Sequence, residues 1–311
     1  MTENEFILAD RLAKIQATIN QYGMDNFYLS FSGGKDSTVL HYLLDMALPY
    51  NNIPRVYANT GIEYKMIYEF VEELAKTDER FVIIKPSVPI KPMLESVGYP
   101  FKSKFHSDCV NRFEKHNRKF DENTTSVKHY YLGDSGWHQR TCPAKLKYQF
   151  EDEKLPFKIS PLCCSELKKK PLHKWQEENA KPYVILGIMA SEGGQRESAK
   201  CVAFEGKRLK KFQPLVPITK EWEDWFIETY DLKICDIYKP PYNFVRTGCK
   251  GCPFALGLQE ELDTLQKYFP EERKQCEIIW KPVYEEYRRL RYRLKPLPEY
   301  EQLELDLEKG R

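Results

Sequence analysis

The sequence of 311 residues lacks the features that mark membrane, secreted and fibrous proteins. No run of apolar residues is long enough to cross a bilayer, so we expect no membrane partner. The first residues carry Glu3 and Glu5 and no basic segment followed by an apolar one, so we expect no secretory signal and a cytoplasmic location. The formal net charge is only +2, which gives no whole-chain attraction to nucleic acid. Internal repeats and low-complexity tracts are also missing.

Cysteine is present in an odd number, which argues against a framework of disulfide bonds in a chain without a secretory signal. The nine cysteines are Cys109, Cys142, Cys163, Cys164, Cys201, Cys235, Cys249, Cys252 and Cys276. These cysteines are therefore better candidates for metal or cluster ligands than for disulfide bonds. The remaining composition, with 41% hydrophobic and 30% charged residues, is that of a globular protein.

A stretch with two adjacent glycines organises the N-terminal part of the chain. Residues 28–37 read Tyr-Leu-Ser-Phe-Ser-Gly-Gly-Lys-Asp-Ser, and apolar residues at helical spacing follow. This pattern predicts a strand, a tight turn and a helix. Backbone N–H groups at a glycine turn, hydroxyl groups, a lysine and a helix N-terminus together suit a phosphate. The candidate nucleotide-binding residues of this loop are Ser32, Gly33, Gly34, Lys35, Asp36 and Ser37.

Short apolar strands and amphipathic helices alternate from residue 27 to residue 84, which predicts a parallel sheet with covering helices. A further strand is expected at 182–187 and an extended segment at 212–218. Ligands of such sheets bind beyond the carboxyl ends of the strands, so Thr60 and Gly61 should lie near the nucleotide. We predict a main domain over 1–255, with a helical and loop insertion at about 86–160, and a helical C-terminal extension over 256–311.

Two cysteine pairs stand out among the nine. Cys249-Lys-Gly-Cys252 places two sulfurs on one tight turn, whereas Cys163 and Cys164 are adjacent and can bridge two corners of a large object. A [4Fe–4S] cluster is such an object, and a zinc ion with four cysteine ligands is the alternative. Cys142 is a reserve ligand or thiol.

The stretch Ser32–Ser37 resembles the SGGKDS loop of the ATP pyrophosphatases, which split ATP into AMP and pyrophosphate. The segment from Cys163 to Leu172, together with the distant Cys-x-x-Cys, resembles the iron–sulfur site of the sulfonucleotide reductases. Both features are similar to the PAPS reductase family in its wide sense, over roughly residues 25–255. The resemblance implies a doubly wound, mostly parallel α/β sheet of the adenine-nucleotide alpha hydrolase type, ATP with Mg²⁺, and a [4Fe–4S] cluster.

The chain departs from the sulfonucleotide reductases in two ways. Those enzymes have lost the Gly-Gly-Lys-Asp pattern and carry a nucleophilic cysteine in a C-terminal Glu-Cys-Gly motif. Here the loop is intact and residues 296–311 contain no cysteine. We therefore predict an iron–sulfur ATP pyrophosphatase that adenylates a nucleic acid or a small molecule for sulfur transfer, with a cysteine desulfurase as a candidate sulfur donor. A sulfonucleotide reductase and a non-catalytic nucleotide-sensing module are the alternatives.

Individual roles follow from the resemblance and from charge. Lys35 would neutralise the departing pyrophosphate, and Asp36 would orient Mg²⁺ or cap the helix. Arg196, in a loop similar to the family's Arg-containing loop Gln195–Ser198, would bind phosphate. Glu63 is a candidate to replace the carboxylate that the family has where this chain has Asn59. The basic stretches 102–119 and 287–293 are candidates for nucleic-acid contact or for solvated helix faces.

Overall fold

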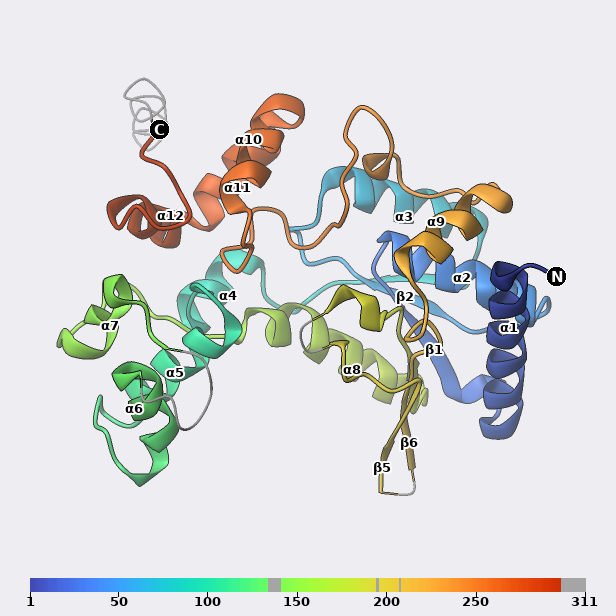
Figure 1. Cartoon of the computed structure of the whole chain (residues 1–311), viewed down its shortest axis with the longest axis horizontal. Coiled ribbons are helices and arrows are strands. Elements are labelled where there is room, and N and C mark those ends of the chain that lie inside the picture. The colour runs from blue at the N-terminus through green and yellow to red at the C-terminus, as the bar shows by residue number, and fades with distance from the viewer. Residues whose placement is uncertain (134–140, 194–195, 207, 298–311) are drawn as a thin grey trace. The chain divides into compact units, whose positions relative to one another are not determined.

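The computed structural model describes residues 1–133, 141–193, 196–206 and 208–297 (Figure 1). The chain divides into two compact units. Unit 1 consists of Met1–Ser87 and Leu167–Gly248, and unit 2 consists of Val88–Glu166 and Cys249–Arg311. The predicted C-terminal extension and most of the predicted insertion thus fall in unit 2, while the boundary at residue 255 stays a prediction. Among the described helices, none combines the length and the apolar character that a bilayer crossing requires.

Unit 1 is built on one sheet with the strand order β3-β2-β1-β4-β6-β5. All neighbouring strands are parallel except β5 and β6, which form an antiparallel pair at one edge. This confirms the predicted doubly wound, mostly parallel α/β fold. The strands are β1 (Phe27–Phe31), β2 (Arg55–Ala58), β3 (Phe81–Ile84), β4 (Tyr183–Ile185), β5 (Val202–Glu205) and β6 (Arg208–Phe212).

Helices cover both faces of this sheet. Helix α2 packs against β1, α3 against β3, and α1 and α9 against α2, whereas α8 contacts β2 and β3 (Figure 1). Right-handed crossovers put α2 and α3 on one face, and α8 returns the chain to β4 across the other. The helices are α1 (Glu3–Tyr22), α2 (Lys35–Ala47), α3 (Lys65–Thr77), α8 (Lys170–Glu178) and α9 (Lys220–Thr229), with short 3-10 turns η1 (Met24–Asn26), η5 (Ala190–Glu192) and η7 (Asp236–Tyr238).

Strand β1 lies at the point where the chain direction across the sheet reverses. The chain moves from β1 to β2 on one side, and β4 pairs with β1 on the other side. Crevices open beyond the carboxyl ends of the strands at such switch points. The glycine loop follows β1 directly, so the topology brings it to the position where nucleotides bind in folds of this kind.

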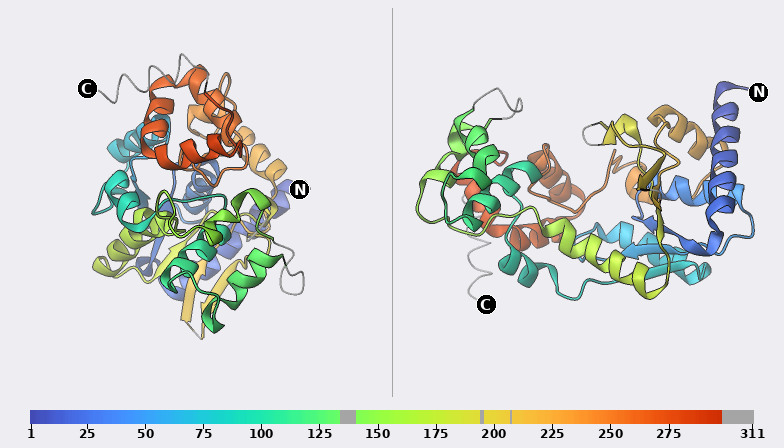
Figure 2. Two further views of the ribbon diagram at one scale, coloured as in Figure 1. Left: turned by 90° about the vertical axis from the view of Figure 1, so that its left-hand side faces the viewer. Right: turned by 90° about the horizontal axis from the view of Figure 1, so that it is seen from below.

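The β5–β6 hairpin was not predicted, and the extended segment expected at 212–218 belongs to the sheet only through Phe212. The hairpin lies at the free edge of the sheet, drawn in yellow in Figure 2. In β6, Leu209 and Phe212 are buried while Lys210 and Lys211 are exposed, so the alternation of period two is broken. A bulge between Ala203 and Phe204 shifts the register and accounts for this break.

Unit 2 is helical in its described residues. Its core includes an aromatic cluster in which the Phe101 ring lies 4.7 Å from the Tyr287 ring, between centroids. The buried His106 bonds to the Tyr130 hydroxyl at 2.8 Å and to Gln149 Oε1 at 2.7 Å. Its helices are α4 (Ile90–Val97), α5 (Lys104–Lys115), α6 (Thr125–Leu132), α7 (Tyr148–Glu151), α10 (Leu258–Tyr268), α11 (Pro270–Ile279) and α12 (Lys281–Arg289), with 3-10 turns η2 (Glu122–Thr124) and η3 (Ala144–Leu146); the π-helical turn η4 (Ser165–Lys169) spans the boundary between the two units in the sequence.

Candidate active site and cysteine turn

Two glycines shape the loop after β1. Gly33 allows close contact with α3, and Gly34 begins α2 as its N-cap residue. Gly33 has φ +71°, and a Cβ atom there would lie 2.7 Å from Ile67 Cγ2 and 2.9 Å from Val71 Cγ2 on α3. Gly34 is the N-cap residue of α2, and its backbone N–H donates to Ser32 Oγ at 3.2 Å. A side chain at Gly33 would therefore displace α3, and the loop can approach α3 this closely only as glycine.

Hydroxyl groups close the loop on itself. Ser32 Oγ and Ser37 Oγ are 2.9 Å apart, and Ser37 Oγ also donates to the Gly34 carbonyl at 2.9 Å. The loop is thus preformed around the N-terminus of α2, where backbone N–H groups and the helix dipole favour an anion. Because Gly34 is the N-cap, the alternative in which Asp36 caps the helix is wrong. Asp36 instead lies in the first turn of α2.

Lys35 is buried and paired with two carboxylates of α9. Its Nζ lies 2.7 Å from Asp224 Oδ1 and 3.0 Å from Glu223 Oε2. Burial opposes the ammonium charge, but the two carboxylates outweigh it and raise the pKa of Lys35 above its ordinary value. Lys35 therefore carries its positive charge at every physiological pH.

Glu223 is the most buried carboxylate of the candidate site, with a relative exposure of 1%. Burial, and then the nearby Asp36, raise the pKa of Glu223 to about 7, against the opposing charge of Lys35. Neither of its oxygens accepts a hydrogen bond of ordinary geometry from the described residues, so its compensation comes from ion pairs. Sequence reasoning missed Glu223 and Asp224, because acidic residues in the first turn of a helix are common.

Thr60 and Gly61 lie at the carboxyl end of β2, as the sequence predicted. Glu63 accepts from the backbone N–H of Thr60 at 3.0 Å and from its hydroxyl at 2.8 Å. Lys168 Nζ also lies 3.2 Å from Glu63 Oε1. The Glu63 carboxylate thus holds the turn together. Gly61, with φ +78° and open space where a Cβ would stand, is exposed beside it.

Arg196 belongs to the same neighbourhood as the loop. Burial and the charge of Arg246 lower the pKa of Arg196, while Asp36 raises it. Arg246 was not predicted, and neither were Tyr238 and Thr247, whose hydroxyls bond to each other beside Gly34. These residues come from a segment punctuated by proline and glycine, which showed no periodic signal. Of the predicted Arg-containing loop, Gln195 lies outside the described residues.

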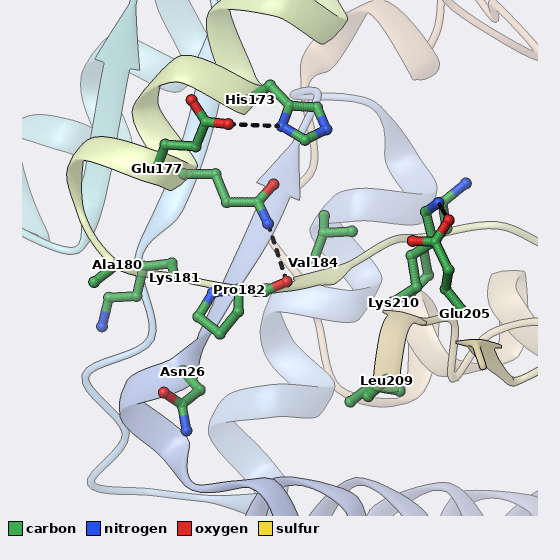
Figure 3. Close-up of a pocket in the computed structure, with 12 residues that line it drawn as sticks. Asn26, His173, Glu177, Ala180, Lys181, Pro182, Val184, Glu205, Leu209 and Lys210 are labelled. Atoms are coloured by element: carbon green, nitrogen blue, oxygen red, sulfur yellow. Dashed lines mark hydrogen bonds and ion pairs between the residues drawn. The ribbon is translucent and has the colours of Figure 1, made fainter. Parts of the chain in front are cut away.

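Two cavities lie in unit 1 at opposite ends of its strands. A cavity of about 290 Å³ is lined by Lys35, Asp224 and apolar residues of the 234–245 segment. A larger one of about 630 Å³ lies where β1 and β4 begin, between α8 and β6. Figure 3 shows the larger cavity, with Asn26 and Pro182 just before those strands and with His173 on α8. The smaller cavity is the one that adjoins the glycine loop.

The Cys249–Cys252 turn in unit 2 is enclosed by the C-terminal helices. Trp280 Nε1 donates to the Lys250 carbonyl at 3.2 Å, and the Tyr284 hydroxyl donates to the Gly251 carbonyl. The Tyr287 hydroxyl donates to the Pro253 carbonyl at 2.9 Å. Buried carbonyls need such partners, so Trp280, between α11 and α12, and two tyrosines of α12 supply what the turn cannot supply itself.

Position 251 requires glycine, because of its backbone conformation and because of its close neighbours. Its φ is +59°, and a Cβ there would lie 2.8 Å from Cys276 Sγ. The N–H of Gly251 donates to Glu261 Oε1 of α10 at 2.9 Å. Lys250 is buried and ion-paired to Glu272 at 2.7 Å. All three C-terminal helices therefore contribute side chains to the surroundings of this turn.

The four predicted ligand cysteines all lie in unit 2. Cys163 and Cys164 directly precede the π-helical turn η4, and Cys164 is half-buried like Cys249 and Cys252. Burial raises the pKa of Cys252, and the neighbouring Cys249 and Cys164 raise it further. Two of the other three candidate ligands thus act on the Cys252 thiol. Within the described ranges, no three His, Cys, Asp or Glu side chains are arranged around a single metal ion.

The predicted basic stretches make intramolecular contacts. Arg288 and Arg289 pair with Glu277 and Glu286, and Tyr287 is fully buried. In the other stretch, Lys102 Nζ donates to the Tyr130 hydroxyl at 3.1 Å. These residues have structural duties, and nucleic-acid contact by either stretch stays a prediction.

Residues 26–128 match the family model described as the phosphoadenosine phosphosulfate reductase domain. This part of the chain is therefore similar to the PAPS reductase family. The match includes the glycine loop and ends before either cysteine pair. A GMP synthase (glutamine-hydrolyzing) from Thermosipho africanus (strain TCF52B) is 30% identical over 162 residues, which is 47% of this chain and 31% of that protein. The chain thus matches about a third of the length of that relative.

Solved structures with a similar fold include a PAPS reductase from Candida auris in a phosphate complex, 15% identical, with a TM-score of 0.40, covering 76% of this chain and 91% of that one. Another is the U34-tRNA thiolase NcsA from Methanococcus maripaludis with its [4Fe-4S] cluster, 17% identical, with a TM-score of 0.40, covering 92% of this chain and 80% of that one. Similarity at this level carries no inference about this chain, and the ligands named belong to those proteins.

Proposed function

We propose that this protein is an ATP pyrophosphatase that adenylates an acceptor for sulfur transfer. The observation that carries the proposal is the preformed glycine loop at the switch point of the sheet, with a charged, buried lysine in the first turn of α2. That combination offers backbone N–H groups, hydroxyls and a cation to the β- and γ-phosphates of ATP. The proposal gives Asp36 the role of orienting Mg²⁺ and gives Arg196 a phosphate contact.

In the first step an acceptor oxygen attacks the α-phosphorus of ATP. The bond between the α-phosphorus and the bridging oxygen breaks, and pyrophosphate leaves with the electron pair. Lys35 and the loop N–H groups stabilise the charge that grows on the leaving group. In the second step a sulfide-level donor attacks the activated carbon, and AMP leaves with the former acceptor oxygen. A cysteine desulfurase with a reductant would supply such sulfur, and a nucleic acid or a small molecule would be the acceptor.

The cysteine turn fits a [4Fe–4S] cluster by the chemistry of its donors. Cys163, Cys164, Cys249 and Cys252 would hold it as thiolates. Burial, and then the nearby Cys249 and Cys164, raise the pKa of Cys252, and bound iron would offset this cost of holding a thiolate there. Ligation by all four thiols would close the cluster, and it would then act through structure and charge; ligation by three would leave an iron free to carry sulfur.

The reductase alternative needs a reactive thiol near the C-terminus. The last cysteine in the sequence, Cys276, is fully buried on α11 against Gly251. Burial raises its pKa above that of an ordinary thiol, which keeps it protonated and unreactive. Cys276 is therefore a poor nucleophile, and this favours ATP cleavage as the reaction of this chain.

The test uses protein purified without oxygen and α-labelled ATP, incubated with tRNA, DNA and small acceptors. We expect labelled AMP and pyrophosphate with one acceptor class, and sulfide-dependent incorporation of sulfur. Lys35→Ala is the matched inactive control. Release of sulfite from adenylyl sulfate or its 3′-phosphate with thioredoxin, without AMP formation from ATP, would instead establish the reductase alternative. A brown colour with absorption near about 400 nm, lost in Cys249→Ser, tests the cluster, whereas colourless protein with stoichiometric zinc would contradict it.

A further inference from the structure

The pairing of Lys35 is unusual for a lysine that is to meet phosphate. Its ammonium is already neutralised by Glu223 and Asp224 on α9. A second lysine, Lys220, lies 3.6 Å from Asp224 Oδ1 and 3.8 Å from Glu223 Oε2. Two cations and two carboxylates therefore form one compact network at the edge of the glycine loop, beside the 290 Å³ cavity.

Glu223 is the member of this network whose charge has the largest desolvation penalty. It is almost fully buried, and its oxygens accept no well-aligned hydrogen bond from the described residues. A buried carboxylate is destabilising unless a cation compensates its charge. Lys35 is the nearest such cation, at 3.0 Å, while Lys220 stands farther off.

We propose that Glu223, assisted by Asp224, is a positioning residue that holds Lys35 against α9 and competes with the nucleotide phosphates for it. The inference rests on the proposed function in one respect, namely that the loop binds the phosphates of ATP. The carboxylates keep the lysine ordered and charged when no anion is bound. They also lower the affinity for nucleotide, because the phosphates can bind Lys35 only by replacing its ion pairs with Glu223 and Asp224.

The test measures equilibrium binding of α,β-methylene-ATP, which cannot be cleaved between its α- and β-phosphates, so no acceptor is needed. Glu223→Gln removes the competing charge and should tighten binding roughly tenfold, within the usual range of couplings between sites. Glu223→Asp keeps the charge and should bind like the unmodified protein. Glu228→Gln is the matched control, since Glu228 is an exposed carboxylate of the same helix and cavity.

A double-mutant cycle decides whether Glu223 acts through the lysine. In a Lys35→Ala background, Glu223→Gln should no longer change the affinity. An equal gain in both backgrounds would mean simple repulsion of the nucleotide, and no gain in either would mean a structural role only. Both results overturn the inference. If the unmodified protein binds the analogue but forms no AMP with any acceptor, the proposed function fails while this inference is still decided by the cycle.

Discussion

The two candidate centres of this protein are built in opposite ways. In unit 1 the glycine loop is continuous in the sequence, from Ser32 to Ser37, and its own hydroxyl and N–H groups close it. In unit 2 the cysteine pairs are separated by some eighty residues, and the Cys249–Cys252 turn depends on side chains from three later helices. A phosphate site can be local because backbone N–H groups do most of the binding. A site of thiols needs a scaffold from elsewhere in the chain.

Replacing Lys35 should cause the largest loss of activity, and the effect should be confined to the glycine loop of unit 1. We expect Lys35→Ala to reduce AMP and pyrophosphate formation by roughly a hundredfold to a thousandfold, because the charge on the leaving group loses its cation. The absorption of the cysteine centre should stay unchanged. Radiolabelled turnover and absorption spectra measure the two readouts. Activity within a few-fold of the unmodified protein would contradict the proposed role of Lys35.

Acid should destabilise both units through the buried His41 of unit 1 and the buried His106 of unit 2. Burial lowers the pKa of His41 to about 4 and that of His106 to about 3, from an ordinary value of 6.5. The unfolded chain therefore takes up protons first, so stability is full above pH 6.5 and is lost as the pH falls towards 4. Since one pKa unit corresponds to about 1.4 kcal/mol, the combined loss should reach several kcal/mol.

Urea unfolding between pH 7.5 and 4, with hydrogen exchange followed in each unit, measures this loss. His106→Gln cannot titrate and should flatten the pH dependence in unit 2 while leaving that of unit 1, which contains His41, unchanged. An unchanged slope in both units would show that other groups carry the acid sensitivity.

Replacing glycine by alanine should destabilise the tightly packed turn at Gly251 more than the exposed turn at Gly61. Gly251→Ala combines a positive φ with a clash against Cys276, so we expect a loss of about 2–4 kcal/mol in the free energy of unfolding and disruption of the cysteine turn. Gly61→Ala has a positive φ but open space, and should lose only about 1 kcal/mol. Thermal unfolding compares the two, and equal losses would contradict the clash at Gly251.

The smallest expected effects come from single hydroxyls that bind the turn. Tyr284→Phe removes one bond to the Gly251 carbonyl and should lose about 1 kcal/mol. Tyr287→Phe should lose about 2 kcal/mol, because its hydroxyl also accepts from the Lys102 N–H at 2.6 Å and both partners would be left unpaired. Chemical denaturation measures both losses. A larger loss for Tyr284→Phe would reverse this ranking.

Much of unit 1 could be predicted because its signals are local. The predicted alternation of strands and helices from residue 27 to residue 84 is confirmed by β1, α2, β2, α3 and β3, and the loop after β1 follows from two glycines and a helical pattern. The β5–β6 hairpin could not be predicted, since a bulge and adjacent lysines remove the alternation that identifies a strand. Asp36 was expected either to orient Mg²⁺ or to cap the helix. Because Gly34 is the N-cap, Asp36 is a residue of the first turn, and its role with Mg²⁺ stays a prediction.

The sequence by itself determined the strand–loop–helix of residues 28–47 and the presence of two cysteine pairs. Spacing and residue type carry that information without any distant contact. Tertiary contacts were needed to show that α9 supplies the partners of Lys35, and that the Cys249–Cys252 turn is held by Glu261 of α10, by Trp280 and by Tyr284 of α12. Ion pairs and hydrogen bonds between residues far apart in the chain depend on folding, so no local pattern in the sequence announces them.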